Sequence, residues 1–357
     1  MNPIDTFLEL AVNQGGSDLH VISGEVPRIR INGSLQPIRF RELSREDVEA
    51  MLSEMMSESH RARLAAECSV DFAYHKPELG RFRVNVSRNV RGIGAVLRVI
   101  PSKIRALDEL GLPPVLKTTI AVPKGLTLVT GPTGSGKSTT LAAMIDHINE
   151  VRQGHVITIE DPIEFIHGFK RCLVTQREVG THAPSFGEAL RSAVREDPDL
   201  ILVGEMRDLE TISLALTAAE TGIQVFGTLH TNGTVRAIDR IINVFPARRH
   251  DQIRTILADT LRMIVAQQLV RKADGSGRLA AVEVLINTNA VASMVRTANS
   301  FKLASAIHAG SRAGMQALDA VLMDLVRKEA ISGEEAYEHA LDRTQFERYL
   351  VQDSSPQ

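Results

Sequence analysis

A short glycine-rich segment, residues 131–138, combines small residues with a lysine and a serine in a spacing suited to phosphate chemistry. It reads Gly-Pro-Thr-Gly-Ser-Gly-Lys-Ser and matches the phosphate-loop pattern G-x-x-x-x-G-K-[ST] at every fixed position. Glycines let backbone N–H groups curl around a phosphate, and a helix that starts there adds partial positive charge. Lys137 would reach the β- and γ-phosphates of ATP, and Ser138 would bind Mg²⁺. The residues expected to contact ATP are Gly131, Pro132, Thr133, Gly134, Ser135, Gly136, Lys137, Ser138 and Thr139.

Apolar residues flank this segment in the order that a phosphate loop requires. Residues 126–129 predict a buried strand before it, and residues 142–145 predict a helix after it. The alternative is an ordinary glycine-rich turn in front of a helix. We favour the phosphate loop because the fixed positions, the strand and the helix all agree.

Carboxylates follow two later apolar runs, where they could act on a bound nucleotide. Glu160, Asp161 and Glu164 come after the apolar residues 156–159, and Glu205 ends the Walker-B-like run Asp199-Leu-Ile-Leu-Val-Gly-Glu. In an open α/β sheet, ligands bind beyond the carboxyl ends of the strands. A carboxylate there can bind Mg²⁺ through water or activate the attacking water. A solvated acidic loop explains either segment alone, but two such strand ends favour chemistry.

One histidine, His230, ends another apolar run, Val225-Phe-Gly-Thr-Leu. A lone histidine more often has a structural role. Its position at the same predicted edge of the sheet makes a sensor of the γ-phosphate the better interpretation.

The elements before residue 101 predict a separate α+β domain. A helix is expected over residues 4–12, a β-hairpin around Asn32-Gly33, and a helix capped by Ser44. Alternation in residues 81–86 and 93–100 predicts strands, which carry Arg83 and Arg98. On the residues alone, a strand that bears arginines most often presents a solvated face.

The rest of the chain predicts a linker and a second domain. Residues 101–114 are rich in proline and glycine, which suits a linker. Strands and helices then alternate through Phe226, as in a mostly parallel, doubly wound sheet. The last hundred residues predict helices, one of which would bear the stripe Ile253, Ile256, Leu257, Leu261 and Ile264.

Composition limits the classes of protein that fit. The chain has 357 residues, 43% hydrophobic and 24% charged, which suits about two soluble domains. Its formal charge of −2 gives no basic footprint, so no nucleic acid is expected as a partner. Cys68 and Cys172 are far apart, which argues against a disulfide framework and a zinc site, and both are expected in the core. No export signal or membrane-spanning run is evident, so a cytoplasmic protein is expected.

Together these motifs resemble the secretion ATPase superfamily, and within it the type IV pilus retraction ATPases. The resemblance extends over nearly the whole chain; it is carried by residues 131–138, 160–164, 199–208 and 227–231, with Gly15-Gly-Ser-Asp-Leu-His20, Arg81-Phe-Arg-Val84 and Gly314-Met-Gln-Ala-Leu-Asp319 in support. It implies an α/β fold in which a RecA-like P-loop ATPase domain follows a smaller α+β PAS-like domain. The implied domains are residues 1–100 (PAS-like), 101–114 (linker) and 115–357 (RecA-like, with a C-terminal helical region).

The resemblance also implies roles for residues. Glu164 matches the catalytic carboxylate of the acidic box, Glu205 the Walker-B acid that holds Mg²⁺ through water, and His230 the histidine box. Arg83 and Arg98 match paired arginines that reach the triphosphate, which replaces the solvated-face interpretation. The implied assembly is a homohexamer with ATP between protomers.

Two departures bear on function. Ile223 follows Gly222 where relatives usually carry another histidine, so a coupling role at that position is in doubt. Residues 269–283 lack the tetracysteine zinc insertion of pilus-assembly relatives, which favours retraction over assembly and predicts no zinc.

The resulting expectation is a hexameric, Mg²⁺-dependent ATPase that drives pilus retraction and twitching motility. It would be cytoplasmic and peripheral at the inner membrane, with a membrane platform protein of the pilus as partner. The alternatives are an accessory paralogue of a retraction motor and a motor that moves DNA or a conjugation substrate.

Overall fold

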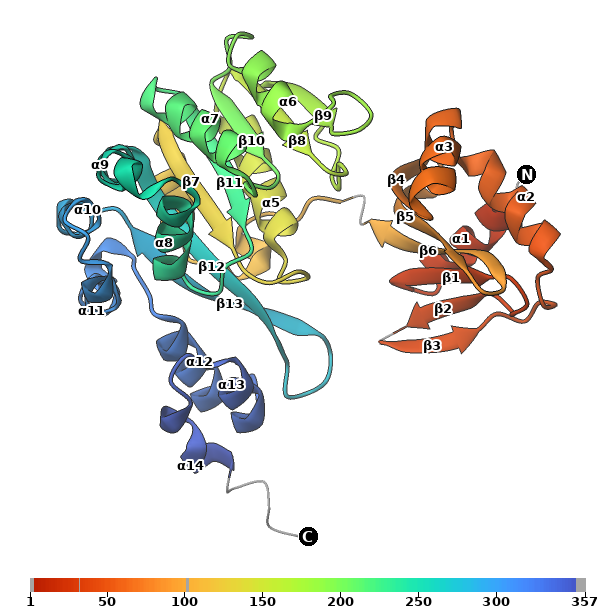
Figure 1. Ribbon diagram of the computed structural model, residues 1–357. Coiled ribbons are helices and arrows are strands. Elements are labelled where there is room, and N and C mark those ends of the chain that lie inside the picture. Colours follow the sequence, from red (N-terminus) through yellow and green to blue (C-terminus); the bar gives the residue numbers. More distant parts are fainter. Residues whose placement is uncertain (1–2, 32, 101–102, 351–357) are drawn as a thin grey trace. The chain divides into compact units, whose positions relative to one another are not determined.

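The computed structural model describes residues 3–31, 33–100 and 103–350, and these divide into two compact units (Figure 1). Unit 1 contains the chain up to Lys103 together with Pro162–Ile166, and unit 2 contains Ile104–Asp161 and the chain from His167 onward. Asn32, in the turn of the expected β-hairpin, lies outside the described residues. Within the described ranges, no helix is both long and apolar enough to cross a membrane.

Unit 1 is built on an antiparallel sheet, and its described strands follow the order β3-β2-β1-β6-β5-β4. The strands are β1 (Asp18–Ile22), β2 (Arg28–Ile31), β3 (Ser34–Pro37), β4 (Ser69–Lys76), β5 (Gly80–Asn89) and β6 (Gly92–Ile100). The helices are α1 (Pro3–Asn13), α2 (Arg45–Met55) and α3 (Glu58–Glu67). Apolar residues of the helices and the sheet form one core.

Local sequence explains how these elements form. Oγ of Ser44 accepts from the Asp47 backbone N–H, and the Asp47 carboxylate accepts from the Ser44 backbone N–H, so the capping box of α2 is complete. On β5, Phe82 and Val84 are fully buried, whereas Arg83 between them is half-buried. The alternation predicted for this strand is therefore confirmed, and it turns Arg83 away from the core.

Unit 2 contains a mostly parallel sheet with the described strand order β13-β12-β7-β11-β10-β8-β9, in which only the β12–β13 pair is antiparallel. The strands are β7 (Gly125–Thr130), β8 (His155–Glu160), β9 (Leu173–Glu178), β10 (Leu200–Val203), β11 (Gln224–Leu229), β12 (Leu261–Arg271) and β13 (Arg278–Ile286).

Helices cover both faces of this sheet, as Figure 1 shows. Buried residues of α4 and α5 form a core with one face, and buried residues of α6 to α10 form a core with the other. The helices are α4 (Val115–Ile120), α5 (Lys137–Val151), α6 (Phe186–Ala193), α7 (Leu209–Glu220), α8 (Thr234–Val244), α9 (His250–Thr260) and α10 (Asn289–Arg296). The doubly wound α/β arrangement predicted from the sequence is confirmed.

The helical stripe predicted for residues 253–264 is wrong in its second half. α9 ends at Thr260, and both Leu261 and Ile264 lie on β12. The run after residue 260 is almost continuously apolar, so its periodicity suits a buried strand as well as a helix. Pairing with β7 on one side and β13 on the other decides in favour of the strand.

The chain after β13 is helical. These elements are α10, α11 (Leu303–Ala309), α12 (Leu318–Arg327), α13 (Gly333–His339) and α14 (Glu347–Leu350). Residues of α12 and α13 form a small core with Val270 and Ala281 of the β12–β13 pair.

Two further expectations concern the linker and the two cysteines. Leu107 and Leu112, inside the segment expected as a linker, are buried in the core of unit 2. Cys172 is buried as expected, but the expectation of a buried Cys68 is wrong. Cys68 ends α3 with a φ of 61°, and this left-handed C-cap position is exposed.

Candidate nucleotide-binding site

The phosphate loop lies between β7 and α5, in the strand-loop-helix order predicted from the sequence. The φ angles of Gly134 and Gly136 are 80° and 86°, in the left-handed region that glycine alone adopts without strain. Substitution of either residue would therefore distort the loop in front of the N-terminus of α5.

Close packing also constrains the start of the loop. A Cβ atom at Gly131 would lie 2.2 Å from the backbone oxygen of Gln267 and 2.7 Å from Oγ of Ser135. Both distances are shorter than any van der Waals contact, so glycine is required there. Gln267 of β12 thus lies directly against the loop, although it was not among the residues predicted for the site. The sequence feature that could have identified Gln267 is that it is a polar residue within an otherwise mostly apolar run.

Two side chains of the loop suit an oxyanion partner. Nζ of Lys137 donates to the backbone oxygens of Gly131 and Pro132, at 2.9 and 3.0 Å, and so lies across the loop. Oγ of Ser135 is buried and has no hydrogen-bond partner among the described residues. A buried hydroxyl of this kind inside a curl of N–H groups fits a phosphate group. The loop therefore has the donors that a triphosphate requires.

A threonine pair connects the start of this loop to the segment that bears the histidine. Oγ1 of Thr130, the last residue of β7, lies 2.5 Å from the backbone oxygen and 2.7 Å from Oγ1 of Thr231. The backbone N–H of Thr231 donates to the same Thr130 hydroxyl at 3.1 Å. Because β7 and β11 are parallel neighbours, their carboxyl ends meet at one edge of the sheet.

Glu205 and His230 lie together at this edge. Nε2 of His230 is 3.0 Å from Oε1 of Glu205, and the guanidinium of Arg207 forms an ion pair with the same carboxylate. The Glu205 side chain is 21% exposed, so it is held in place while remaining open to solvent. Backbone hydrogen bonds from Gly204 to Ile159 and from Met206 to Thr228 fix this turn between its neighbouring strands. The two residues that the sequence placed at the same edge of the sheet follow adjacent strands and are in contact.

Arg83 and Arg98 belong to unit 1, where they lie directly opposite each other on the β5–β6 pair. Nε of Arg98 donates to Oδ1 of the buried Asp18 at 2.8 Å, and Nε of Arg83 is 3.9 Å from Asp71. Burial raises the pKa of the Asp18 carboxyl, but hydrogen bonds from Ser17 and Arg98 outweigh it, so that pKa is below its ordinary value. Ionised Asp18 therefore offsets the repulsion between the two arginines.

Glu164 also belongs to unit 1, within Pro162–Ile166. It is half-buried between the buried Ile163 and Phe165. The roles of Glu164, Arg83 and Arg98 at a nucleotide stay predictions. Ile223, at the position of the departure from the family pattern, packs against the main core of unit 2.

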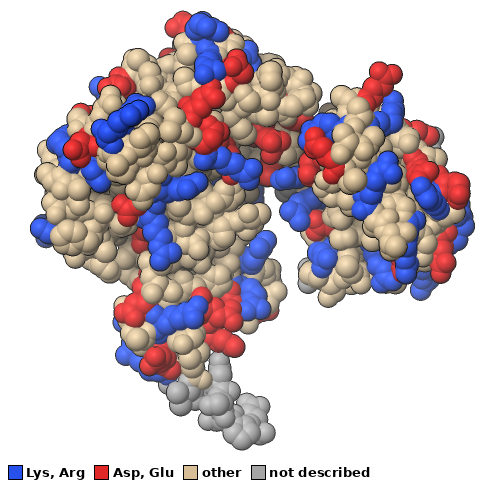
Figure 2. Space-filling model, in the orientation of Figure 1, with Lys and Arg blue, Asp and Glu red and all other residues tan. Residues whose placement is uncertain are grey.

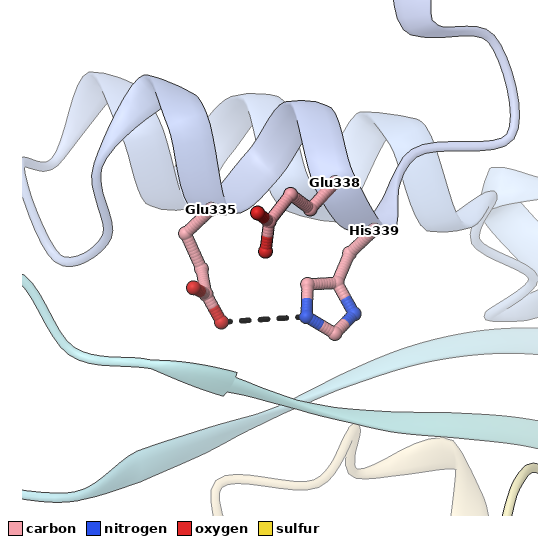
Figure 3. Close-up of side chains that lie close together, drawn as sticks. All are labelled: Glu335, Glu338 and His339. Atoms are coloured by element: carbon pink, nitrogen blue, oxygen red, sulfur yellow. Dashed lines mark ion pairs between the residues drawn. The ribbon is translucent and has the colours of Figure 1, made fainter.

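Three potential metal ligands gather on α13, away from the phosphate loop in the sequence. Figure 3 shows Glu335, Glu338 and His339 on one helix, with the ion pair between Glu335 and His339 at 3.3 Å. Nε of Arg271 donates to Glu335 at 2.7 Å, and the Arg271 backbone N–H donates to the other oxygen. Nδ1 of His339 lies 2.6 Å from Oε1 of Gln268. With these partners, the group is an ion-pair network that attaches α13 to β12.

Charge is mixed in sign on the face drawn in Figure 2, where Lys and Arg side chains are interspersed with Asp and Glu on each unit. This face differs from the continuous basic stripe that characterises nucleic-acid tracking proteins.

Comparison with known proteins gives the same family for the whole chain. The model of the family described as "Type II/IV secretion system protein" matches residues 1–355. The "Type IV pilus retractation ATPase PilT" of Pseudomonas aeruginosa is 49% identical, over 94% of this chain and 98% of its own length. A "Twitching motility protein" of Neisseria gonorrhoeae is 47% identical, over 88% and 84%. The "Type IV pilus ATPase PilU" of P. aeruginosa is 41% identical, over 94% and 88%.

Solved structures agree with these sequence matches. The crystal structure of the pilus retraction motor PilT with bound ADP superimposes with a TM-score of 0.90 at 40% identity, over 98% of this chain and 99% of that one. The ATPase DotB of Legionella pneumophila superimposes with a TM-score of 0.80 at 31% identity, over 93% and 94%. Both alignments span the two units.

Proposed function

The chain belongs to the type II/IV secretion system protein family, and from that membership we propose that it is an ATPase motor that retracts type IV pili. It hydrolyses ATP, as the PilT ATPases that it resembles over nearly their full length do. The observation that supports the proposal is that hydrogen bonds between Thr130 and Thr231 connect the start of the phosphate loop to the segment that bears His230. There, Lys137 lies across the loop and Glu205 contacts His230, and both observations support roles for these residues in cleaving a triphosphate.

The phosphate loop binds the substrate. Its backbone N–H groups and the N-terminus of α5 hold the β- and γ-phosphates, and Lys137 exchanges its two carbonyl partners for phosphate oxygens. Ser138, with Glu205 through water, would hold Mg²⁺. When bound, Mg²⁺ supplies neutralisation of charge on the phosphates.

Two carboxylates serve the cleavage step. Glu164 accepts the proton of the attacking water, since a carboxylate near the γ-phosphate can act as general base. Glu205 is held between Arg207 and His230, which fixes its orientation. His230, in contact with Glu205, is the proposed sensor of the γ-phosphate.

The arginines of unit 1 complete the site from a neighbouring subunit. In this proposal the chain forms a homohexamer, and Arg83 and Arg98 reach the triphosphate of the adjacent protomer. Asp18 holds Arg98 in an exposed position with 64% of its side chain accessible. Unit 1 is the PAS-like domain in this scheme. The motor works in the cytoplasm at the inner membrane, on a platform protein of the pilus.

A second candidate function is an accessory retraction ATPase, supported by the 41% identity to PilU. The same geometry serves both, so the distinction rests on whether the chain drives retraction alone.

The deciding experiment deletes the gene and complements the strain with the wild-type chain or with Glu205→Gln. A retraction motor predicts excess surface pili and lost twitching in the deletion, with recovery by the wild-type chain only. Loss of pili would point to assembly, and normal twitching would point to the accessory role. Purified wild-type chain should also hydrolyse ATP without added DNA, and strict dependence on DNA would support the DNA-motor alternative.

A further inference from the structure

The β12–β13 pair carries two buried polar side chains, Gln267 and Glu283, which are 3% and 6% exposed. They lie on adjacent strands, because Glu283 faces Ala266, the residue before Gln267, in the register of the pair. Burying such groups is unfavourable unless hydrogen bonds satisfy them. Their partners therefore indicate what the two residues position.

Gln267 binds the phosphate loop through both ends of its amide. Its Nε2 atom donates to the backbone oxygen of Ser135 at 2.7 Å, and its Oε1 atom accepts from Oγ1 of Thr140 at 2.7 Å. One partner lies in the loop and the other in the first turn of α5. The amide thus connects the curl of the loop to the helix that continues it.

Glu283 binds the other side of the site. Its Oε1 atom accepts from the backbone N–H of Thr234 at 2.8 Å and from Oγ1 of the same residue at 2.7 Å. Thr234 is the first residue of α8, where a carboxylate also gains from the partial positive charge of the helix end. The segment that this contact holds begins only four positions earlier, at His230.

We propose that the β12–β13 pair positions the nucleotide site through two side chains. Gln267 sets the shape of the phosphate loop, and Glu283 fixes the segment that carries His230. A loop that is held in its binding shape before the nucleotide arrives loses less conformational freedom on binding. Removing Gln267 should therefore weaken affinity, whereas removing Glu283 should slow turnover through His230 and Glu205. The inference rests on the proposed ATPase function.

The first test measures binding of a fluorescent ADP analogue with Mg²⁺ to the full chain. Gln267→Met keeps the side-chain volume and removes both hydrogen bonds, and we expect binding about tenfold weaker. Gln268→Met is the matched control, because the adjacent glutamine contacts His339 and not the loop. It should bind within about twofold of the wild type.

Thermal unfolding of both variants without nucleotide separates positioning from stability. A purely structural Gln267 would lower the melting temperature and leave the affinity of the folded chain unchanged, and that result would overturn the inference. Equal weakening in both variants would overturn it as well. Failure of the wild-type chain to bind the probe would instead overturn the proposed function.

The second test measures steady-state ATP hydrolysis. Glu283→Leu removes the acceptor for Thr234, and we expect kcat about tenfold lower, with affinity for the ADP probe within about threefold. Glu283→Gln keeps an acceptor oxygen at the same place and should retain most of the wild-type kcat. An equal loss of kcat in the leucine and glutamine variants, or a loss confined to KM, would refute the role of Glu283.

Discussion

Nε2 of His230 lies 3.0 Å from Oε1 of Glu205, so the ends of two parallel strands are in direct contact through their side chains. The guanidinium of Arg207 pairs with the same carboxylate. The Glu205 carboxylate is therefore oriented by two side chains, the guanidinium of Arg207 and the imidazole of His230. Its remaining accessible surface is what a water molecule or a hydrated metal ion could contact.

Replacement of this carboxylate should separate binding from hydrolysis. We expect Glu205→Gln to reduce kcat by about 100-fold or more, because the amide is neutral and cannot orient Mg²⁺ or water as a carboxylate does. Binding of ADP should persist, since the phosphate loop is unchanged. Phosphate release and ADP titration measure the two quantities. Glu210→Gln is the control on α7, and a comparable loss of kcat there would contradict the assignment.

Lys137 should instead govern affinity and catalysis together. Lys137→Ala removes the ammonium that lies across the loop, so we expect ATP binding to weaken by about 100-fold and hydrolysis to become undetectable. Isothermal titration of the purified chain measures the binding. Lys124→Ala, an exposed lysine just before β7, should bind ATP normally. Normal binding by Lys137→Ala would remove the phosphate-loop assignment.

Arg98 should act on the site of another subunit. Pure Arg98→Ala should hydrolyse ATP about 10³-fold more slowly than the wild type. Mixed oligomers of Arg98→Ala and Lys137→Ala subunits, each inactive alone, should regain part of the activity, because an intact phosphate loop then meets an intact arginine of its neighbour. Arg88→Ala, an exposed arginine on β5, should hydrolyse ATP at the wild-type rate. No recovery in the mixed oligomers would show that each subunit uses its own arginine.

His167 should make stability depend on pH. Burial lowers the pKa of this imidazole from 6.5 to about 4, and its Nδ1 is buried with no partner among the described residues. The folded state then binds a proton more weakly than the unfolded state. The free energy of unfolding is therefore unaffected by His167 above pH 6.5 and falls as the pH decreases toward 4, by roughly 3 kcal/mol in total.

Urea unfolding between about pH 7.5 and pH 4.5 measures this dependence. His167→Gln should flatten the decline in the free energy of unfolding, because the titrating group is gone. His308→Gln, at an exposed position on α11, should keep the wild-type decline. An unchanged slope in His167→Gln would assign the pH dependence to other groups.

Glu335 should stabilise the attachment of α13. Burial raises the pKa of this carboxyl, but hydrogen bonds from the backbone and guanidinium of Arg271 lower it more, so the pKa is below the ordinary 4.5. A lowered carboxyl pKa stabilises the fold above pH 4.5, and this contribution is lost as the pH falls further. Glu335→Gln should therefore cost about 1–3 kcal/mol at neutral pH.

Glu338→Gln provides the comparison on the same helix. Its side chain is 54% exposed and lies 3.6 Å from Arg271, so we expect a change within about 0.5 kcal/mol. Chemical unfolding monitored by circular dichroism measures both variants. Equal costs at the two positions would show that burial of Glu335 contributes nothing.

Local patterns in the sequence predicted much of the fold. The capping box at Ser44, the alternation along β5 and the glycines of the phosphate loop are set by neighbours within a few residues, so they are visible in one short window. The placement of Glu205 and His230 at one edge of the sheet was also predicted from the strand ends, whereas their direct contact was not.

Other features depend on partners that are distant in the chain. β12 is a strand because β7 and β13 pair with its two edges, whereas its apolar run alone also suits a helix. Gln267 was overlooked for the same reason, since its partners Ser135 and Thr140 belong to a different part of the sequence.

The hydrogen bond from Gln267 to Ser135 spans 132 positions of the chain, so the phosphate loop can acquire this contact only after residue 267 has been synthesised. A nascent chain that ends before Leu261 contains the complete phosphate-loop motif but lacks the strand that anchors it. Contacts of such long range form late in folding. Nucleotide in the cell should therefore stabilise finished chains selectively, so that ATP binding also reports completion of the sheet.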